Sequence, residues 1–370
     1  MVTGVTGQLG HDVVRAGERL ARGAVFSPAG LRSAAGSRPV LCVPEDVSIA
    51  PLARADLDVG DPAQVRRTVL AERPDVIVHA AAYTDVDLAE GEGRLEAYRV
   101  NAFGARAFAE AAQEIGALLV YVSTDYVFDG RRGAPYTEWD SAAPLNEYGR
   151  SKWAGEQFVR GGCRSHHILR TSWLYGAHAP GGNFVEAILR TARRQMEERA
   201  DGRAELSVVA DQTGAPTWSR DLAELVWWLA LSDCAGAPAA PGTYHASGAG
   251  SCTRCAFARA VLEEAGLLER VNIRAVAGGE YPRPARRPAQ SVLEPLALRA
   301  QGLPVLRPWR EALAEFMSAH AAGRESACGG MGYERIAPVR RDRNPVAAAD
   351  VHGSQAAPAG GEQAGPGLRD

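Results

Sequence analysis

Residues 3–10 read Thr-Gly-Val-Thr-Gly-Gln-Leu-Gly, a G-x-x-G-x-x-G spacing that a helix-compatible run over residues 12–22 follows. Glycines at this spacing allow a tight turn between strand and helix, and they let the backbone approach a pyrophosphate closely. A glycine pattern of this kind also occurs in purely structural turns. Because it stands at the head of a series of strands and helices, it predicts a dinucleotide-binding turn built on Gly4, Gly7 and Gly10.

From this turn to about residue 175, short β-branched runs alternate with longer helical stretches. The candidate strands are residues 76–78, 118–122 and 167–169, and the apolar spacing predicts one helix from Ala97 to Ile115. Such alternation is typical of βαβ units around a parallel sheet. We therefore expect an α/β protein with a Rossmann-like doubly wound parallel sheet and a smaller C-terminal substrate-binding region.

Three segments depart from this regular pattern. Only three residues precede Gly4, so the first strand should be shorter than the roughly five residues of a usual strand, which would weaken a cofactor site. Residues 27–50 are rich in Pro, Ala, Ser and Gly and predict an inserted surface loop, while residues 326–370 lose hydrophobic periodicity and predict a disordered tail. We assign residues 1–175 and 212–250 to a dinucleotide-binding region, and residues 176–211 and 251–325 to a substrate-binding region.

The composition narrows the class of partner. With 41 basic and 44 acidic residues, the net charge of −3 gives no broad electrostatic footprint for nucleic acid or an anionic membrane, so a small molecule is favoured. No window approaches the ~20 apolar residues of a membrane span, and no basic and apolar leader precedes the glycine turn, which predicts a cytoplasmic protein. The six cysteines include one C-x-x-C pair, Cys252 and Cys255, which alone is weak evidence for zinc, so we expect no metal site.

Lys152 is the single lysine of the chain, whose other forty basic residues are arginines. Tyr148 precedes it by four residues, so a helix would place both on one face. Tyrosine transfers protons poorly near pH 7 unless a cation lowers its pKa, and an ammonium group is a compact charge that the planar guanidinium of Arg does not replace. Thr124 ends a candidate strand, where ligands of parallel sheets bind, so it can hydrogen-bond a reacting oxygen while Tyr148 transfers the proton. Chance Y-x-x-x-K pairs are common, but this one coincides with the only lysine.

The ribose of a dinucleotide usually meets an acidic residue at the end of the second strand. Here Ala53 and Arg54 stand at that place. Arg54 would suit a 2′-phosphate, although a solvated surface arginine is an equal interpretation. Asp58 and Val59 then precede a helix start and are candidates for contact with an adenine edge or for a simple helix cap.

The motifs together resemble the extended short-chain dehydrogenase/reductases, and more narrowly the dTDP-4-dehydrorhamnose reductase family. They run in the family's order over residues 1 to about 320, and the tail lies outside them. They are T-G-V-T-G-Q-L-G at 3–10, R-P-D-V-I-V-H-A-A-A-Y-T at 73–84, S-T-D-Y-V-F-D-G at 123–130, P-L-N-E-Y-G-R-S-K at 144–152, R-T-S-W-L-Y-G at 170–176, D-Q-T-G-A-P-T at 211–217 and R-P-A-Q-S-V-L at 287–293.

The resemblance implies reduction of dTDP-4-dehydro-L-rhamnose to dTDP-L-rhamnose with NADPH or NADH, NADPH being slightly favoured. It implies Thr124, Tyr148 and Lys152 as catalytic residues, with Tyr148 as proton donor. The cofactor residues would be Gly4, Gly7, Gln8, Leu9, Gly10, Arg54, Asp58, Val59, Ala81, Ala82, Tyr83, Asn101, Tyr148 and Lys152. The substrate residues would be Thr84, Val86, Asp87, Thr124, Asp125, Trp173, Asn183 and Arg287, with Trp173 as an apolar platform for a sugar ring or a core aromatic.

Other interpretations remain open at this point. The superfamily includes sugar-nucleotide epimerases and dehydratases, although dehydratases typically carry an Asp-Glu pair after the catalytic Thr, where this chain has Asp125 and Tyr126. A non-catalytic protein similar to the regulatory subunit of methionine adenosyltransferase is a further alternative, which the intact Thr, Tyr and Lys disfavour. A homodimer is compatible with the family, as is a magnesium ion, for which the sequence offers no acidic cluster.

Overall fold

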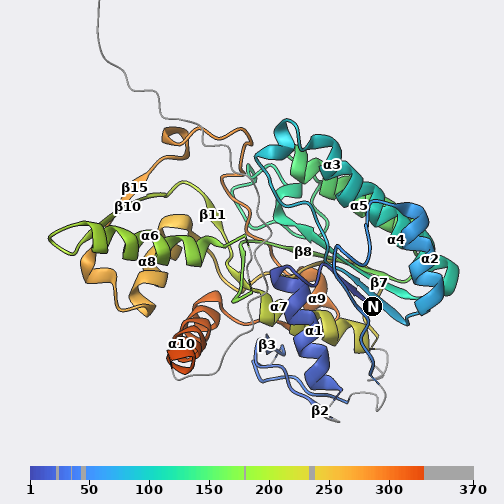
Figure 1. Cartoon of the computed structure of the whole chain (residues 1–370). Coiled ribbons are helices and arrows are strands. Elements are labelled where there is room, and N and C mark those ends of the chain that lie inside the picture. Colours follow the sequence, from blue (N-terminus) through green and yellow to red (C-terminus); the bar gives the residue numbers. More distant parts are fainter. Residues whose placement is uncertain (22–24, 35, 43–46, 179–180, 233–237, 329–370) are drawn as a thin grey trace, which may run out of the picture. The chain divides into compact units, whose positions relative to one another are not determined.

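A computed structural model describes the chain except residues 22–24, 35, 43–46, 179–180, 233–237 and 329–370. Its centre is a parallel sheet of six strands in the order β13-β8-β7-β6-β1-β5, which confirms the expected fold class (Figure 1). The strands are β1 (Val2–Thr3), β5 (Pro51–Leu52), β6 (Val76–His79), β7 (Leu118–Thr124), β8 (His166–Thr171) and β13 (Gly242–His245). The chain passes from β1 to β5 on one side and then returns to β6 on the other, so the strand order reverses between β1 and β6.

Alternate residues of the inner strands enter two different cores, because successive side chains of a strand point to opposite faces. In β7, Leu119 and Tyr121 pack against helices on one face, and Val120 between them packs on the other. The first face is covered by α2 (Pro62–Glu72), α4 (Ala105–Ile115) and α5 (Glu147–Gly162), and the second by α1 (Gln8–Leu20) and α7 (Ser219–Leu231). Burial on both faces explains why these strands read as continuous apolar runs.

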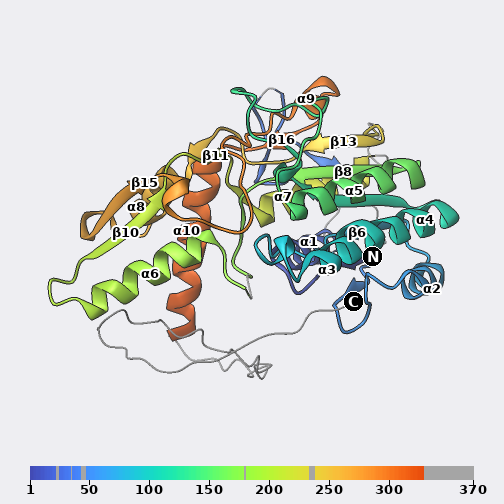
Figure 2. The same ribbon diagram turned by 90° about the horizontal axis from the view of Figure 1, so that it is seen from above.

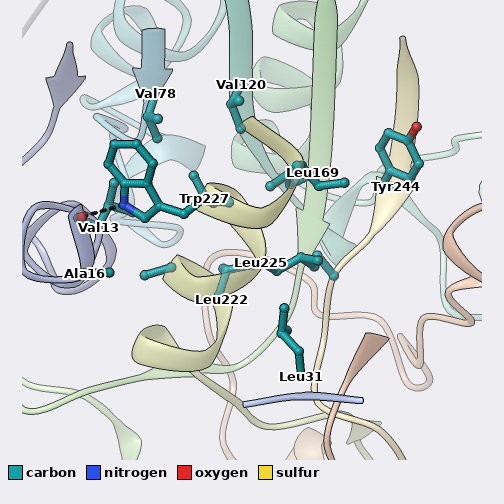
Figure 3. Close-up of a cluster of buried hydrophobic side chains, with 14 of the residues drawn as sticks. Val13, Ala16, Leu31, Val78, Val120, Leu169, Leu222, Leu225, Trp227 and Tyr244 are labelled. Atoms are coloured by element: carbon teal, nitrogen blue, oxygen red, sulfur yellow. Dashed lines mark hydrogen bonds between the residues drawn. The ribbon is translucent and has the colours of Figure 1, made fainter. Parts of the chain in front are cut away.

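Trp227 joins the two helices of the second face. Figure 3 shows its side chain pointing from α7 toward α1, where its indole N–H donates a hydrogen bond of 2.8 Å to the carbonyl of Val13. Gly17 of α1 makes this approach possible, since a Cβ there would lie 2.5 Å from the indole ring. The hydrogen bond satisfies the polar atom of a buried Trp.

The segment expected to be an inserted surface loop is partly a core element. Within it, β3 (Leu31–Arg32) pairs with the distant β16 (Val305–Leu306), and Leu31 is fully buried beside α7 (Figure 3). Two further short strands, β2 (Val25–Phe26) and β4 (Leu41–Cys42), pair with each other. Each of these strands is only two residues long and lies within or beside a stretch rich in Pro and Gly. The sequence therefore shows no strand pattern there.

The helix predicted from Ala97 to Ile115 is interrupted. After α3 (Arg94–Tyr98) the backbone forms a π-helical turn over Arg99–Gly104 before α4 begins. Turns of this type inside helices often occur at functional sites.

A second group of elements packs on its own apolar core and stays together in both views (Figures 1 and 2). It contains α6 (Phe184–Glu198), β10 (Ala204–Val209), α8 (Arg254–Glu264), β15 (Val271–Val276) and α10 (Trp309–Cys328). Residues 296–306, with α9 (Leu296–Ala300), instead contribute Leu298, Leu303 and Leu306 to the core of the main sheet. The domain boundaries themselves stay a prediction, and the expected tail lies outside the described residues from 329 onward.

Two further short strand pairings lie outside the main sheet. The strand β9 (Leu174–Tyr175) pairs with β12 (Thr217–Trp218), and β11 (Thr213–Gly214) pairs with β14 (Cys252–Thr253). No helix in the described part of the chain is both long and apolar enough to cross a membrane.

A buried ion pair ties α5 to β8. Both side-chain oxygens of Glu156 accept hydrogen bonds from Arg170, at 2.9 and 2.7 Å, and both side chains are almost completely buried. Replacing Glu156 by Ala leaves a buried guanidinium without its carboxylate, which costs about 3–5 kcal/mol of folding free energy. Urea unfolding followed by circular dichroism should show a loss of that size.

The matched control is Glu110→Ala on α4, whose ion pair with Arg106 is exposed on both sides. Exposed pairs of this kind contribute about 0.5 kcal/mol or less. Equal losses of stability in the two variants would contradict the larger contribution to folding free energy that we expect from the buried ion pair.

Candidate active site

The glycine turn brings two loops together where the strand order reverses. Gly4 follows β1 with a left-handed φ of 72°, and its carbonyl accepts a hydrogen bond of 3.0 Å from the N–H of Gly7. A Cβ on Gly10 would lie 2.2 Å from the Gly4 oxygen, and one on Gly4 would lie 2.6 Å from the nitrogen of Ala81 in the loop after β6. Within the described chain no side chain caps the first turn of α1, so its N–H groups remain available to an anion.

Gln8 presents its side chain at this turn, whereas Leu9 presents only its backbone. The side-chain oxygen of Gln8 accepts a hydrogen bond of 3.1 Å from Asn183, the residue that caps α6. The side chain of Leu9 lies in the core of the main sheet, so only its backbone can face a cofactor. The structure thus brings Gln8, expected at the cofactor, together with Asn183, expected at the substrate.

Arg54 and Asp58 follow β5 near α3. The side chain of Arg54 is 84% exposed and lies 3.7 Å from Glu96. Asp58 accepts hydrogen bonds of 2.9 Å from Arg99 and of 3.0 Å from the N–H of Gly60, and these bonds hold the pKa of its carboxyl below the ordinary value despite some burial. Arg54 is therefore free to turn toward a ligand, while the carboxylate of Asp58 is already engaged.

Val59 and Ala82 complete this part of the cofactor set. Val59 is half-buried and packs against the core beneath α2 and α4. Ala82 is half-buried in the loop after β6, between Ala81 and Tyr83.

Asn101 holds the loop after β6 from within the π-helical turn. Its side chain is fully buried, accepts a hydrogen bond of 2.9 Å from the N–H of Tyr83 and donates one of 3.1 Å to the Tyr83 carbonyl. It also donates to Ser151 of α5 at 2.9 Å. Asn101 was expected to bind the cofactor, but its amide is used up inside the protein, so it positions the Tyr83 loop instead.

Thr124, Tyr148 and Lys152 meet at the carboxyl edge of the sheet. Thr124 is the last residue of β7, and its hydroxyl lies near enough to Tyr148 to act on the pKa of that tyrosine. Asn146 caps the N-terminus of α5 by accepting from the N–H of Gly149 at 2.8 Å, which sets Tyr148 in the first turn. Lys152 follows one turn later.

The electrostatics of Tyr148 differ from the sequence prediction. Burial raises the pKa of its hydroxyl well above the ordinary value, the Thr124 hydroxyl offsets this only in part, and the charge of Asp125 adds to it. The predicted lowering by Lys152 is not seen, and the Lys152 ammonium instead lies over the ring of Tyr121, with Nζ 4.1 Å from the ring centre. Tyr148 is therefore a neutral hydroxyl near pH 7, able to donate a proton.

Lys152 itself is almost fully buried, with 2% of its surface exposed. Burial lowers the pKa of its ammonium to about 7, although nearby Glu156 acts in the other direction. Among the described residues Nζ makes no hydrogen bond, and it is not one of the unpartnered atoms sealed from solvent. The ammonium group therefore has free donors at the edge of open space.

The expected substrate residues Asp87 and Arg287 bind each other across 200 positions of the chain. Arg287 donates to both carboxylate oxygens of Asp87, at 2.7 and 2.9 Å, and Arg283 and the N–H of Ala285 add further contacts at 3.3 and 3.2 Å. These hydrogen bonds, led by that of Arg287, hold the pKa of Asp87 at about 2. Of their neighbours in the motif, Thr84 is exposed and Val86 half-buried.

Asp125 and Trp173 lie close to the catalytic residues. Asp125 is 2% exposed and accepts a hydrogen bond of 3.1 Å from the Thr124 hydroxyl, and burial raises the pKa of its carboxyl to about 6. Trp173 has a left-handed φ of 46°, an uncommon backbone conformation for a bulky residue that is often found at functional sites. Gly214 lies against its indole, and a Cβ there would be 2.4 Å from the ring.

Several residues of this site were not singled out from the sequence. Arg254 covers the ring of Trp173, Tyr126 packs edge-on against Tyr148 with ring centres 5.8 Å apart, and Tyr121 lies beneath Lys152. Tyr126 stands inside the quoted S-T-D-Y motif, so its position was a usable signal, whereas Arg254 lies between Cys252 and Cys255 and gives none. In the described part of the chain, no three His, Cys, Asp or Glu side chains gather as metal ligands do.

The buried ammonium should be visible in the stability of the cofactor-free protein. Below about pH 7 Lys152 is charged in both states, and the full cost of burying it is present; between about pH 7 and pH 10 the unfolded chain binds more protons, so stability rises with pH. Lys152→Met removes this cost. Its thermal unfolding midpoint should exceed that of the unmodified protein most below about pH 7, and the gap should shrink toward pH 10. A gap independent of pH would contradict the lowered pKa.

The chain is similar to a known protein family and to several known proteins over most of its length. Residues 1–322 match the family described as RmlD substrate binding domain. A spore coat polysaccharide biosynthesis protein of Bacillus subtilis is 40% identical over 277 residues, 75% of this chain and 89% of that protein. A dTDP-4-dehydrorhamnose reductase of Mycobacterium tuberculosis is 40% identical over 274 residues, 73% of this chain and 84% of that protein.

Solved structures agree with this placement. The dTDP-4-dehydrorhamnose reductase of Bacillus anthracis, in complex with NADP, superposes with a TM-score of 0.71 and 38% identity, and the match covers 86% of this chain and 98% of that one. These similarities confirm the resemblance drawn from the motifs. The chain belongs to the RmlD substrate binding domain family.

Proposed function

We propose that this protein reduces the 4-keto group of dTDP-4-dehydro-L-rhamnose to give dTDP-L-rhamnose, with a reduced nicotinamide dinucleotide as co-substrate. The observation that carries the proposal is the arrangement of Thr124, Tyr148 and Lys152: a hydroxyl at the carboxyl end of β7, a tyrosine in the first turn of α5, and a buried ammonium one helical turn further on. The relatives named dTDP-4-dehydrorhamnose reductase support the choice of sugar nucleotide.

The chain's own residues account for the proton side of this reaction. Reducing a ketone to an alcohol adds one hydride to carbon and one proton to oxygen. Thr124 donates a hydrogen bond to the substrate oxygen, and neutral Tyr148 donates the proton to that oxygen as negative charge develops there. The raised pKa of Tyr148 keeps that proton in place at neutral pH until the oxygen can accept it. Lys152 contributes a buried ammonium with free donors one helical turn from Tyr148.

The glycine turn fits a dinucleotide. A side chain at Gly10 would collide with the turn itself and one at Gly4 with the loop after β6, and the uncapped N–H groups of α1 face the place where a pyrophosphate approaches. A reduced nicotinamide supplies the hydride when it is bound. The free donors of Lys152 suit the hydroxyls of the nicotinamide ribose. The loop of Ala81, Ala82 and Tyr83, which Asn101 holds in place, would line the site between the pyrophosphate and this ribose.

NADPH should serve at least as well as NADH. Strand β5 ends at Leu52, and the next residues, Ala53 and Arg54, follow it where many dinucleotide sites carry a carboxylate. Without that acid a 2′-phosphate meets no like charge, and the exposed guanidinium of Arg54 can pair with it. The relative crystallised with NADP supports this preference.

Nothing in the described part of the chain favours the alternative functions, which are a sugar-nucleotide epimerase or dehydratase and a non-catalytic regulatory protein. Elimination chemistry would call for a second acid beside Thr124, and the residue after Asp125 is Tyr126, which packs against Tyr148. A purely regulatory protein would have no use for a buried ammonium without an ion pair near the hydroxyls of Thr124 and Tyr148. We place the reaction in the cytoplasm, in keeping with the unpaired cysteines Cys163, Cys252 and Cys255, while the homodimer stays a prediction.

The test follows the absorbance of the reduced nicotinamide. Purified protein should oxidise NADPH when dTDP-4-dehydro-L-rhamnose is supplied, and should leave it intact with simple aldehydes. NADPH should be used at least as well as NADH, and Arg54→Ala should weaken the use of NADPH alone. No turnover with any keto sugar nucleotide, or equal turnover with simple aldehydes, would overturn the substrate assignment.

A further inference from the structure

Arg254 is held as a fixed cation against the aromatic side of the site. It is the first residue of α8, and the pairing of β14 with β11 places it next to Trp173. Its guanidinium lies over the Trp173 ring, 3.6 Å from the ring centre, and 5.2 Å from that of Phe184. Stacking of this kind fixes a planar cation through its faces and leaves its edge free to donate hydrogen bonds.

The donors of Arg254 have no partner within the described part of the chain. No carboxylate or other acceptor there forms a hydrogen bond or ion pair with its guanidinium, although most arginines nearby are paired, as Arg287 is with Asp87. None of its nitrogens is among the unpartnered atoms sealed from solvent. An arginine in this state is poised for a ligand with several acceptor oxygens.

The electrostatic neighbours of Arg254 place it beside the reacting groups. Burial lowers the pKa of its guanidinium, while Tyr126 and then Asp125 act in the opposite direction and Arg287 adds to the lowering. Asp125 adjoins Thr124, and the charge of Arg287 acts on the pKa of Tyr126. Asp87 is already bound to Arg287, whereas no carboxylate in the described part of the chain contacts the guanidinium of Arg254, so its donors remain unused at this wall.

We propose that Arg254 binds the diphosphate of the nucleotide sugar, in an inference that rests on the function proposed above. The flat guanidinium edge matches the paired oxygens of a phosphate, and Arg is suited to this bidentate contact. A sugar ring stacked on the same face of Trp173 would have to displace Arg254. Trp173 therefore acts as the support of a phosphate-binding arginine on this face, not as a platform for the sugar.

The binding of dTDP, measured by titration calorimetry without cofactor, tests this assignment. A charged hydrogen-bonded contact contributes about 1.5–3 kcal/mol, so Arg254→Met, which keeps the aliphatic packing on Trp173, should weaken dTDP binding about 10- to 100-fold. Arg254→Lys should restore part of the affinity. The affinity of the unmodified protein should also fall more steeply with salt than that of Arg254→Met, because one ion pair is missing in the variant.

Arg259→Met is the matched control, since this exposed arginine lies on the same helix and should leave dTDP binding unchanged. In turnover, Arg254→Met should raise KM for the sugar nucleotide far more than it lowers kcat. Unchanged dTDP affinity in Arg254→Met, an unchanged salt dependence, or no dTDP binding by the unmodified protein would overturn the assignment. A protein that binds dTDP through Arg254 but does not reduce the keto sugar would overturn the proposed function alone.

Discussion

The burial of one ammonium group, that of Lys152, is the constraint on which the architecture of the site depends. The Tyr121 ring lies beneath it, and the Tyr121 hydroxyl donates a hydrogen bond of 2.9 Å to the carbonyl of Asn101. Asn101 in turn binds the loop at Tyr83 and the helix that carries Lys152, through Ser151. Strand β7, the π-helical turn and α5 are thus joined around one charge, whose unused donors point to a ligand.

Contacts between distant segments assemble the remainder of the site. Gln8 meets Asn183 at 3.1 Å, Asp87 meets Arg287 at 2.7 Å, and the β11–β14 pairing seats Arg254 on Trp173. Each contact joins the sheet or its loops to a segment from the second half of the chain. Lys152 and Arg254 form no ion pair among the described residues, and we expect them at the two ends of the bound substrate, Lys152 near Tyr148 and Arg254 at the diphosphate.

The sequence indicated the parallel sheet, the glycine turn and the Tyr148–Lys152 pair, because periodicity and short-range spacing carry that information. It missed the π-helical turn at Arg99–Gly104, which arises from the buried hydrogen bonds of Asn101, and the pairing of Leu31 with Leu306, a contact over 275 positions. It also assigned the wrong direction to the pKa of Tyr148, since burial is a tertiary property and outweighs a charge four residues away. The roles of the individual site residues stay predictions.

The turnover of Lys152→Arg tests the central claim most directly. Arg keeps the positive charge and follows the chain's own preference, so an incidental lysine would tolerate it. Here a planar guanidinium would replace a compact, buried ammonium whose Nζ lies 4.1 Å from the centre of the Tyr121 ring, and it cannot place its charge at the same point. Misplacing such a group by ~1 Å can cost ~100-fold in rate. We expect a variant that folds and binds dTDP like the unmodified protein but reduces dTDP-4-dehydro-L-rhamnose with NADPH about 100-fold more slowly. Turnover close to that of the unmodified protein would contradict the account.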